Sequence, residues 1–523
     1  ISFFGLLKNA VLTGDLSSLS YSFTKSLGGD MIGVLGYYLM SPFNIIYILA
    51  PLKYFGAAVF LTIWLRYGAI GLSFAFLLIK RYKGLESRKW LVPLFSMLPI
   101  VIVYLEELLD GKSPYRYAFA LGLTVLLQFY MGYMISIFIA LYACYYVSPR
   151  LLIEGDLKAK IKNFSIPLLQ AVIYSIIGIA TASVLLLPVF FNLIESKGQV
   201  GGGMTFSFAF QINPLDILSK LVVGGFDTTS GWSAGPNLPN IYIGALGFLG
   251  FIFYFLSQKV GKAKKWAAGI VTLIFLISFV NEFVSKIWHM GQNPAGFFFR
   301  FSWLFSFFML VLAYQAMKQK IVISKRTNCI IGLGLLLSVV YLYFHQYSFI
   351  SKTQPQAISR FLSKFSILSV LGIAAVTCFI FYAYWEKSQK SQLEKMIRMA
   401  LATVILVLAA VLLKTGYLLS QVGITAMLYL SILFILNFKI SRLSMIVVSV
   451  LTIFEFGYNA YLSQVTFGYD DVHKFADATV SVKRVTDNIQ ENADQKFYRI
   501  ATDFAYSRTV PSLVSYPGLS TFS

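Results

Sequence analysis

The chain has 523 residues, of which 58% are hydrophobic and only 12% are charged, and its formal net charge is +21. A soluble domain carries about 25% charged residues, so this composition excludes a water-soluble protein. The positive charge could indicate a nucleic-acid partner, but the basic residues lie in loops between apolar segments. That placement favours topology signals and contacts with anionic lipid over nucleic acid.

Long apolar segments predict about twelve membrane-spanning helices, because about 20 apolar residues cross the hydrocarbon core. Segment 31–52 is apolar but interrupted by Gly36, Pro42 and Pro51, which predicts a re-entrant or interfacial piece. Segment 118–146 is long, and we expect it to be irregular at Gly132. The predicted spans are 54–79, 91–109, 118–146, 164–190, 240–257, 266–284, 299–317, 328–346, 364–385, 398–413, 418–437 and 443–462.

Six short connections between these segments are dense in Lys and Arg, and we call them the basic loops. If the chain starts outside and alternates, all six face the cytoplasm, as such loops do. They lie within 80–89, 158–162, 259–265, 318–326, 387–398 and 439–442. The same topology puts residues 1–50, the acidic segment 106–110, the loop 191–239 and the region after residue 464 outside.

The composition divides the chain into two domains. Residues 1–463 are predicted to form the transmembrane domain, with 1–50 as its first outer segment. Residues 464–523 are richer in charge, contain a predicted strand at 497–500, and are predicted to begin an extracellular domain. The chain opens at Ile1 without Met, so we expect it to be a piece of a longer protein.

Several motifs resemble the YfhO family of bacterial membrane proteins, in order and over nearly the whole chain. They are YSFTKSLGGDMIGVLGYYLMSPFN (21–44), PNIYIG (239–244), WHMGQNPAGFFFRFSWLFSF (288–307), EFGYNAY (455–461), FYRI (497–500) and YPGLSTFS (516–523). The resemblance implies a GT-C-like multi-helix bundle with large outer loops. It also implies transfer of a sugar from an undecaprenyl-phosphate-linked donor to lipoteichoic acid in the envelope of Gram-positive bacteria.

The resemblance further implies which partners the protein meets. They are the lipid-linked donor, a teichoic-acid-type acceptor, membrane lipids, and the enzyme and flippase that supply the donor. Family members begin with one more span and an acidic outer segment, where GT-C enzymes usually place their catalytic acid. The stretch 95–99 also looks shortened relative to the family, so the resemblance leaves open a catalytic base in a segment before residue 1 or near residues 96–97.

A lipid-phosphate leaving group needs cationic donors at the membrane edge, and arginine offers a planar fork for phosphate oxygens. Arg300 opens an apolar segment just after an outer loop, and His289 precedes it by eleven residues. We predict that both bind the donor phosphate. The alternative is that Arg300 only reaches the headgroups and that His289 is an ordinary polar loop residue.

The acceptor hydroxyl needs a general base, normally a carboxylate. Asp30 is the first candidate because it lies in the strongest motif, Asp15 is the second, and Glu106 or Glu107 is the third. The alternative for Asp30 is a turn after Gly28 and Gly29 with a cap on the next helix. For the two glutamates the more common role is to mark a helix end at the membrane interface.

Exposed aromatic and amide side chains could line a groove for the sugar or the polyprenyl chain. The candidates are Tyr21, Tyr37, Tyr38, Trp232, Trp288, Gln292 and Asn293. Tyr and Trp also populate membrane interfaces without a catalytic role. No metal-binding spacing is present, although a divalent metal requirement stays open.

Two charges, Arg66 and Glu455, fall inside predicted spans. Such charges are candidates for function, but they could also pair with each other or with a polar neighbour such as Asn459. They keep a second function open, a transporter or flippase of lipid-linked sugars with polar residues near the midplane. A third possibility is a non-catalytic assembly protein of the envelope.

Overall fold

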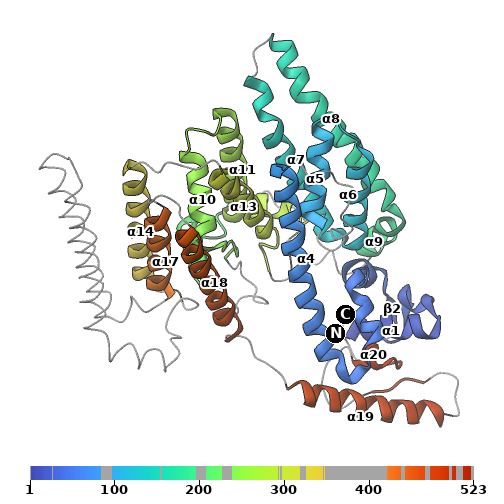
Figure 1. The fold of residues 1–523 in the computed structure, drawn as a ribbon. Helices are drawn as coiled ribbons and strands as arrows, with labels where there is room; N and C mark the ends of the chain where they lie inside the picture. Colours follow the sequence, from blue (N-terminus) through green and yellow to red (C-terminus); the bar gives the residue numbers. More distant parts are fainter. Residues whose placement is uncertain are drawn as a thin grey trace, which may run out of the picture.

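The structure is a computed structural model, and helices make up most of the chain that it describes (Figure 1). The one sheet within that part has two antiparallel strands, β1 (Tyr21–Ser22) and β2 (Gly29–Asp30). The described residues are 2–25, 28–83, 97–152, 156–195, 208–225, 238–292, 294, 297–318, 325–345, 347, 421–436, 442–465, 471–493, 498–501 and 510–519.

The described helices follow one another along the chain as α-helices joined by shorter 3-10 and π turns. The α-helices are α1 (Ser2–Thr13), α2 (Ile32–Val34), α3 (Ile45–Leu49), α4 (Phe55–Lys83), α5 (Met97–Leu109), α6 (Tyr115–Leu127), α7 (Phe129–Val147), α8 (Leu157–Thr181), α9 (Ser183–Glu195), α10 (Gly244–Leu256), α11 (Lys262–Val280), α12 (Glu282–Ile287), α13 (Ser302–Lys318), α14 (Lys325–His345), α17 (Gln421–Leu436), α18 (Arg442–Val465), α19 (Val472–Glu491) and α20 (Val510–Val514). The short turns are η1 (Leu16–Leu19), η2 (Leu35–Leu39), η3 (Pro42–Asn44), η4 (Leu52–Tyr54), η7 (Ser148–Leu152) and η9 (Pro214–Leu221).

Five of the described helices are long and apolar enough to cross a membrane, namely α4, α7, α8, α11 and α18. The pair Ile32–Leu39 and Pro42–Leu49 would add a sixth if it forms one span, and its two helices meet at 92°. This confirms the predicted all-α polytopic membrane protein, and the bend agrees with the predicted interruption of segment 31–52. The predicted span 240–257 is shorter than expected, because α10 has only 13 residues. The predicted spans 364–385 and 398–413 lie outside the described residues.

The predicted single span over 118–146 is wrong, because the chain reverses direction inside it. Helix α6 ends at Leu127, and Gln128 takes extended backbone angles (φ −161°, ψ 97°) before α7 begins. A Cβ on Gly132 would lie 2.9 Å from the Cα of Val125, so the glycine lets α7 fold back closely onto α6. The interruption at Gly132 was predicted, but it marks a hairpin between two helices and not a kink in one.

The acidic segment 106–110 does not lie at the end of the bundle where it was predicted. Glu107 pairs with Lys80 at 2.5 Å, and Glu106 lies 3.5 Å from Arg81. Asp110 likewise pairs with Arg150 at 3.3 Å, beside the basic start of α8. The segment therefore shares the end of the bundle that carries the basic loops, because α5, α6 and α7 run back and forth as two hairpins.

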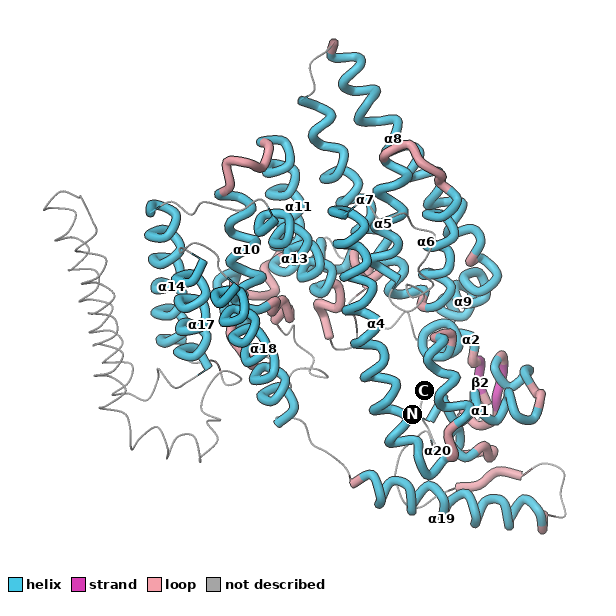
Figure 2. The backbone as a smooth tube through the Cα atoms, in the orientation of Figure 1, coloured by secondary structure: helices cyan, strands magenta, loops and turns pink. Residues whose placement is uncertain are grey.

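Small residues allow the closest helix contacts in this half of the bundle, where α6 and α8 lie side by side (Figure 2). A Cβ on Gly178 would lie 2.5 Å from the carbonyl oxygen of Ala118, and one on Gly122 would meet Thr181. Close backbone approach of this kind is typical of helix pairs in membranes. Farther along the chain, α10 packs along α13 in the same apolar core.

The first segment of the chain and the region after α18 pack on each other. Helix α1 lies against α20, and a Cβ on Gly5 would collide with the backbone of Leu513. Ser512 donates a hydrogen bond to the carbonyl oxygen of Thr24 at 3.1 Å. Helix α19 crosses the lower end of α4, near the two ends of the chain (Figure 1). Of the strand predicted at 497–500, the structure describes residues 498–500 and forms one parallel bridge, from Ile500 to Gly518.

Candidate functional site

Arg300 lies just before α13 and joins two of the motifs found in the sequence. Its Nη1 donates a hydrogen bond of 2.6 Å to the hydroxyl oxygen of Tyr37. The guanidinium carbon lies 5.6 Å from the ring centre of Tyr130 and 5.8 Å from that of Phe297. Three separate segments, η2, α7 and the approach to α13, therefore surround this one side chain.

The positive charge of Arg300 is not balanced by a carboxylate. None of the ion pairs among the described residues includes Arg300, and its Nε is buried without a hydrogen-bond partner. Removing such a group from water is costly unless an anion or acceptor completes it. Aromatic faces compensate only part of a cation's charge. Arg300 therefore keeps one donor of its planar guanidinium without a partner among the described residues.

His289 does not contact Arg300 through a hydrogen bond but holds two of its neighbours, Tyr130 and Phe298. Its side chain is 4% exposed, its Nε2 lies 2.5 Å from the carbonyl oxygen of Phe298, and its Nδ1 lies 2.6 Å from the hydroxyl of Tyr130. A carbonyl can only accept, so Nε2 carries the proton and Nδ1 accepts from Tyr130. Burial lowers the pKa of His289 to about 4, which keeps the ring neutral at pH 7. Both nitrogens thus have protein partners, and His289 positions Tyr130 and the segment before Arg300.

The two acids ranked first in the sequence both take part in local turns. The Oδ1 of Asp30 accepts a hydrogen bond of 2.6 Å from the backbone N–H of Ile32, at the start of α2. Asp15 is exposed, and its Oδ1 accepts from the backbone N–H and the hydroxyl of Ser17 at the start of η1. Asp30 thus has the capping contact that was the alternative to catalysis, while one carboxylate oxygen remains for other contacts.

Among the predicted groove residues, the Tyr37–Tyr38 pair lies at the site. The two rings are 4.6 Å apart, and Tyr38 is 51% exposed beside the half-buried contact of Tyr37 with Arg300. Tyr21 and Gln292 are exposed, and the backbone N–H of Gln292 donates a hydrogen bond of 3.2 Å to the carbonyl oxygen of His289. Trp288, in contrast, is 2% exposed and stacks on Phe301 at 4.7 Å, so it is a core residue. Trp232 and Asn293 lie outside the described residues.

The two charges inside spans have separate structural partners and do not meet each other. Arg66 donates to Ser41 and Asn44 at 3.3 and 3.2 Å, which ties α4 to the bent segment 32–49. Glu455 accepts from the hydroxyl of Tyr242 at 2.6 Å and from the backbone N–H of Ala245 at 2.7 Å. Glu455 therefore holds the start of α10, which agrees with the structural alternative and not with a pair between Glu455 and Arg66.

Tyr130 is the site residue that the sequence argument did not select. It was visible only as one of several polar side chains in an apolar run, together with Gln128 and Tyr133. Its role follows from the hairpin at Gln128, which places the first turn of α7 against Arg300 and His289. As for metals, the described residues contain no group of three or more His, Cys, Asp or Glu that could hold an ion.

The fold is that of a multi-pass membrane protein, and its aromatic-lined Arg300 has no carboxylate partner among the described residues. A family model described as "Bacterial membrane protein YfhO" matches residues 1–98 and 87–523. The chain therefore belongs to the YfhO family. The two matches overlap over residues 87–98, which include part of the stretch that looked shortened in the sequence. Comparisons with curated proteins and with solved structures found no match.

Proposed function

We propose that this chain is an integral membrane glycosyltransferase of the GT-C type. It would move a sugar from an undecaprenyl-phosphate-linked donor to lipoteichoic acid or a related polymer on the outer face of a bacterial membrane. The family suggests glycosylation, and the observation that carries the proposal is the uncompensated, aromatic-lined Arg300 with its unpartnered Nε. A donor phosphate would supply the anion that this site lacks.

The proposed reaction assigns one task to each group. A carboxylate, with Asp30 as the first candidate and Asp15 as the second, takes the proton of the acceptor hydroxyl. The acceptor oxygen then bonds to the anomeric carbon as the bond from that carbon to the phosphate oxygen breaks. Arg300 stabilises the charge that develops on the departing lipid phosphate. Tyr37 holds the guanidinium in place through its hydroxyl.

The roles of the surrounding residues follow from their contacts. His289 keeps Tyr130 against Arg300, and it acts through that residue and not on the phosphate directly. Tyr38, exposed next to Tyr37, is the proposed stacking surface for the sugar or the lipid chain. The donor would come from a separate enzyme and flippase, since an outer site has no access to cytoplasmic nucleotide sugars.

The direct test uses the full-length protein in nanodiscs with radiolabelled undecaprenyl-phosphate-sugar and purified lipoteichoic acid. We expect label to move into the polymer, and Arg300→Ala to lose this transfer while still reaching the membrane in normal amount. Arg442→Ala is the matched control, because Arg442 is an exposed arginine at the start of α18.

The outcomes separate the proposed function from its alternatives. Full activity of Arg300→Ala would contradict the phosphate assignment. Label that crosses between the leaflets of sealed vesicles, with none in the polymer, would instead identify a transporter of lipid-linked sugars. A protein with neither activity would point to an assembly role in the envelope.

A further inference from the structure

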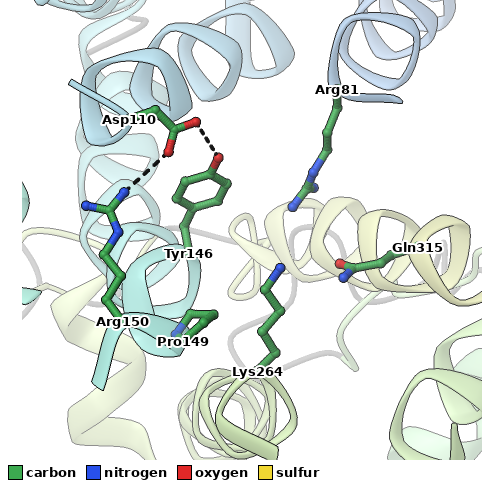
Figure 3. Close-up of a pocket in the computed structure, with 7 residues that line it drawn as sticks. All are labelled: Arg81, Asp110, Tyr146, Pro149, Arg150, Lys264 and Gln315. Atoms are coloured by element: carbon green, nitrogen blue, oxygen red, sulfur yellow. Dashed lines mark hydrogen bonds and ion pairs between the residues drawn. The ribbon is translucent and has the colours of Figure 1, made fainter. Parts of the chain in front are cut away.

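A polar cavity lies beside the ends of α4 and α7 and the start of α11, away from the Arg300 site (Figure 3). Its volume is about 390 Å³, within the range of about 300–1,000 Å³ that is usual for small-molecule sites. Four helices and one turn contribute to it, α4, α7, α11, α13 and η7, together with the residue after α5. The lining residues are Arg81, Asp110, Tyr146, Pro149, Arg150, Lys264 and Gln315.

The cavity holds more positive than negative charge. Arg150 pairs with Asp110 at 3.3 Å, and Arg81 lies 3.5 Å from the buried Glu106. Glu106 also accepts a hydrogen bond of 2.6 Å from Tyr142, so its carboxylate is already engaged. Lys264 is the third cation, and it makes no hydrogen bond or ion pair with the residues that the structure describes. One positive charge at this open cavity therefore has no carboxylate partner among the described residues.

The free donors point into the same space. Figure 3 shows the ammonium of Lys264 extending from α11 toward Arg81 and Gln315. Gln315 is 8% exposed, and its carbonyl oxygen accepts from Tyr145 at 3.1 Å, which leaves its amide nitrogen as a donor on the cavity side. A cavity lined by cations and one buried amide donor matches an oxyanion with several acceptor oxygens.

We propose that this cavity binds a phosphate ester, such as the headgroup of an anionic phospholipid in the leaflet beside the basic loops. Surface lysines that only contact the headgroup region lie on separate outward faces. Here, in contrast, Arg81, Arg150 and Lys264 converge from three elements on one cavity. The site lies at the opposite end of α7 from Tyr130, so it is separate from the Arg300 site and does not depend on the proposed transferase.

The test measures lipid binding to the full-length protein in neutral detergent, by native mass spectrometry and by titration. We expect saturable binding of phosphatidylglycerol and much weaker binding of phosphatidylcholine with the same acyl chains. Lys264→Gln should weaken phosphatidylglycerol binding by about tenfold, the effect of losing one charge-assisted hydrogen bond. Lys264→Arg should retain binding because it keeps the charge, which also shows that the fold tolerates substitution there.

Lys262→Gln is the matched control, since Lys262 is exposed on the same first turn of α11 and does not line the cavity. Equal weakening by Lys262→Gln and Lys264→Gln would overturn the proposal in favour of general surface electrostatics, and so would equal binding of the two lipids. Competition by soluble glycerol 3-phosphate at similar concentration would support the phosphate site and assign it to a free phosphate ester. Absence of such competition would assign it to the lipid.

Discussion

Acidification from pH 7.5 to pH 5 is expected to destabilise the region around His289. Burial lowers the pKa of the folded histidine to about 4, whereas an unfolded histidine titrates near 6.5. Between these values the unfolded chain binds a proton that the folded chain does not. The free energy of unfolding must therefore fall as the pH falls through this window, and the contribution is fully present above about pH 6.5.

The size of the effect follows from the two pKa values. Linkage between pKa values of about 4 and 6.5 gives a loss of about 2 kcal/mol between pH 7.5 and pH 5. The side chain is 4% exposed, so solvent screening does not reduce this figure much. Folded His289 takes up its proton only near its own pKa of about 4, where protonation at Nδ1 removes the acceptor of the Tyr130 hydrogen bond, so the Arg300 site should be lost at a lower pH than the one at which stability begins to fall.

The comparison variant is His289→Gln, which keeps one donor and one acceptor but does not titrate. Denaturant titrations at several pH values should show that the wild type loses about 2 kcal/mol more than the variant. The chain has only 3 His, so the NMR signal of His289 can be assigned by its absence in the variant. A midpoint near 6.5 for that signal, or parallel pH profiles for the two proteins, would refute the burial argument.

Three further substitutions test other parts of the structure. Arg300→Lys keeps the charge but loses the planar fork, so kcat/KM for sugar transfer should fall about 10- to 100-fold with normal membrane insertion; unchanged kinetics would mean that charge alone suffices. Gly178→Ala should lower the free energy of unfolding by about 1–3 kcal/mol, because the added Cβ would meet the backbone of α6. Gly68→Ala on α4 serves as the control, because a Cβ there would meet no neighbouring atom. Glu455→Ala should cost about 2–4 kcal/mol by leaving the Tyr242 hydroxyl and a backbone N–H unpaired; a melting temperature equal to that of wild type would show that water replaces the carboxylate.

The class of fold could be predicted from the sequence because the hydropathy of a membrane span is summed over about 20 residues. Helix α4 was expected over 54–79 and is found over Phe55–Lys83, and α11 and α18 are likewise close to prediction. The same hydropathy reasoning fails for helices that are shorter than a full membrane span. A window of about 20 residues cannot distinguish one bent span from α6 and α7 packed as a hairpin, since both present the same apolar run.

The error over 106–110 has the same origin. Two arrangements of the chain between residues 84 and 147 leave the basic loops on one side, namely two full spans or a set of shorter hairpins. Loop charge therefore could not choose between them, and the acids were placed at the wrong end. Only the ion pairs of Glu107 with Lys80 and of Asp110 with Arg150 distinguish the two arrangements.

The candidate site was predicted in part. Arg300 and Tyr37 were selected separately from motifs 263 residues apart, but their hydrogen bond depends on packing between distant segments. Tyr130 could not be selected without the reversal at Gln128. Trp288 was selected wrongly as a groove residue. Its position in a loop motif suggested a binding role, but the side chain is buried and stacks on Phe301 in the core.

The contact between α1 and α20 has a consequence for biosynthesis. The Tyr37 motif is carried by the first segment of the chain, which is held in place by residues 510–514 and by the Ser512–Thr24 hydrogen bond. On the ribosome these residues emerge only after every membrane helix described above has been made. The helices can therefore insert before the support for the Arg300 site exists, and a nascent chain that stops after α18 would be membrane-embedded with its first motif unanchored. We therefore expect the first motif to be anchored beside Arg300 only after the membrane helices have been inserted.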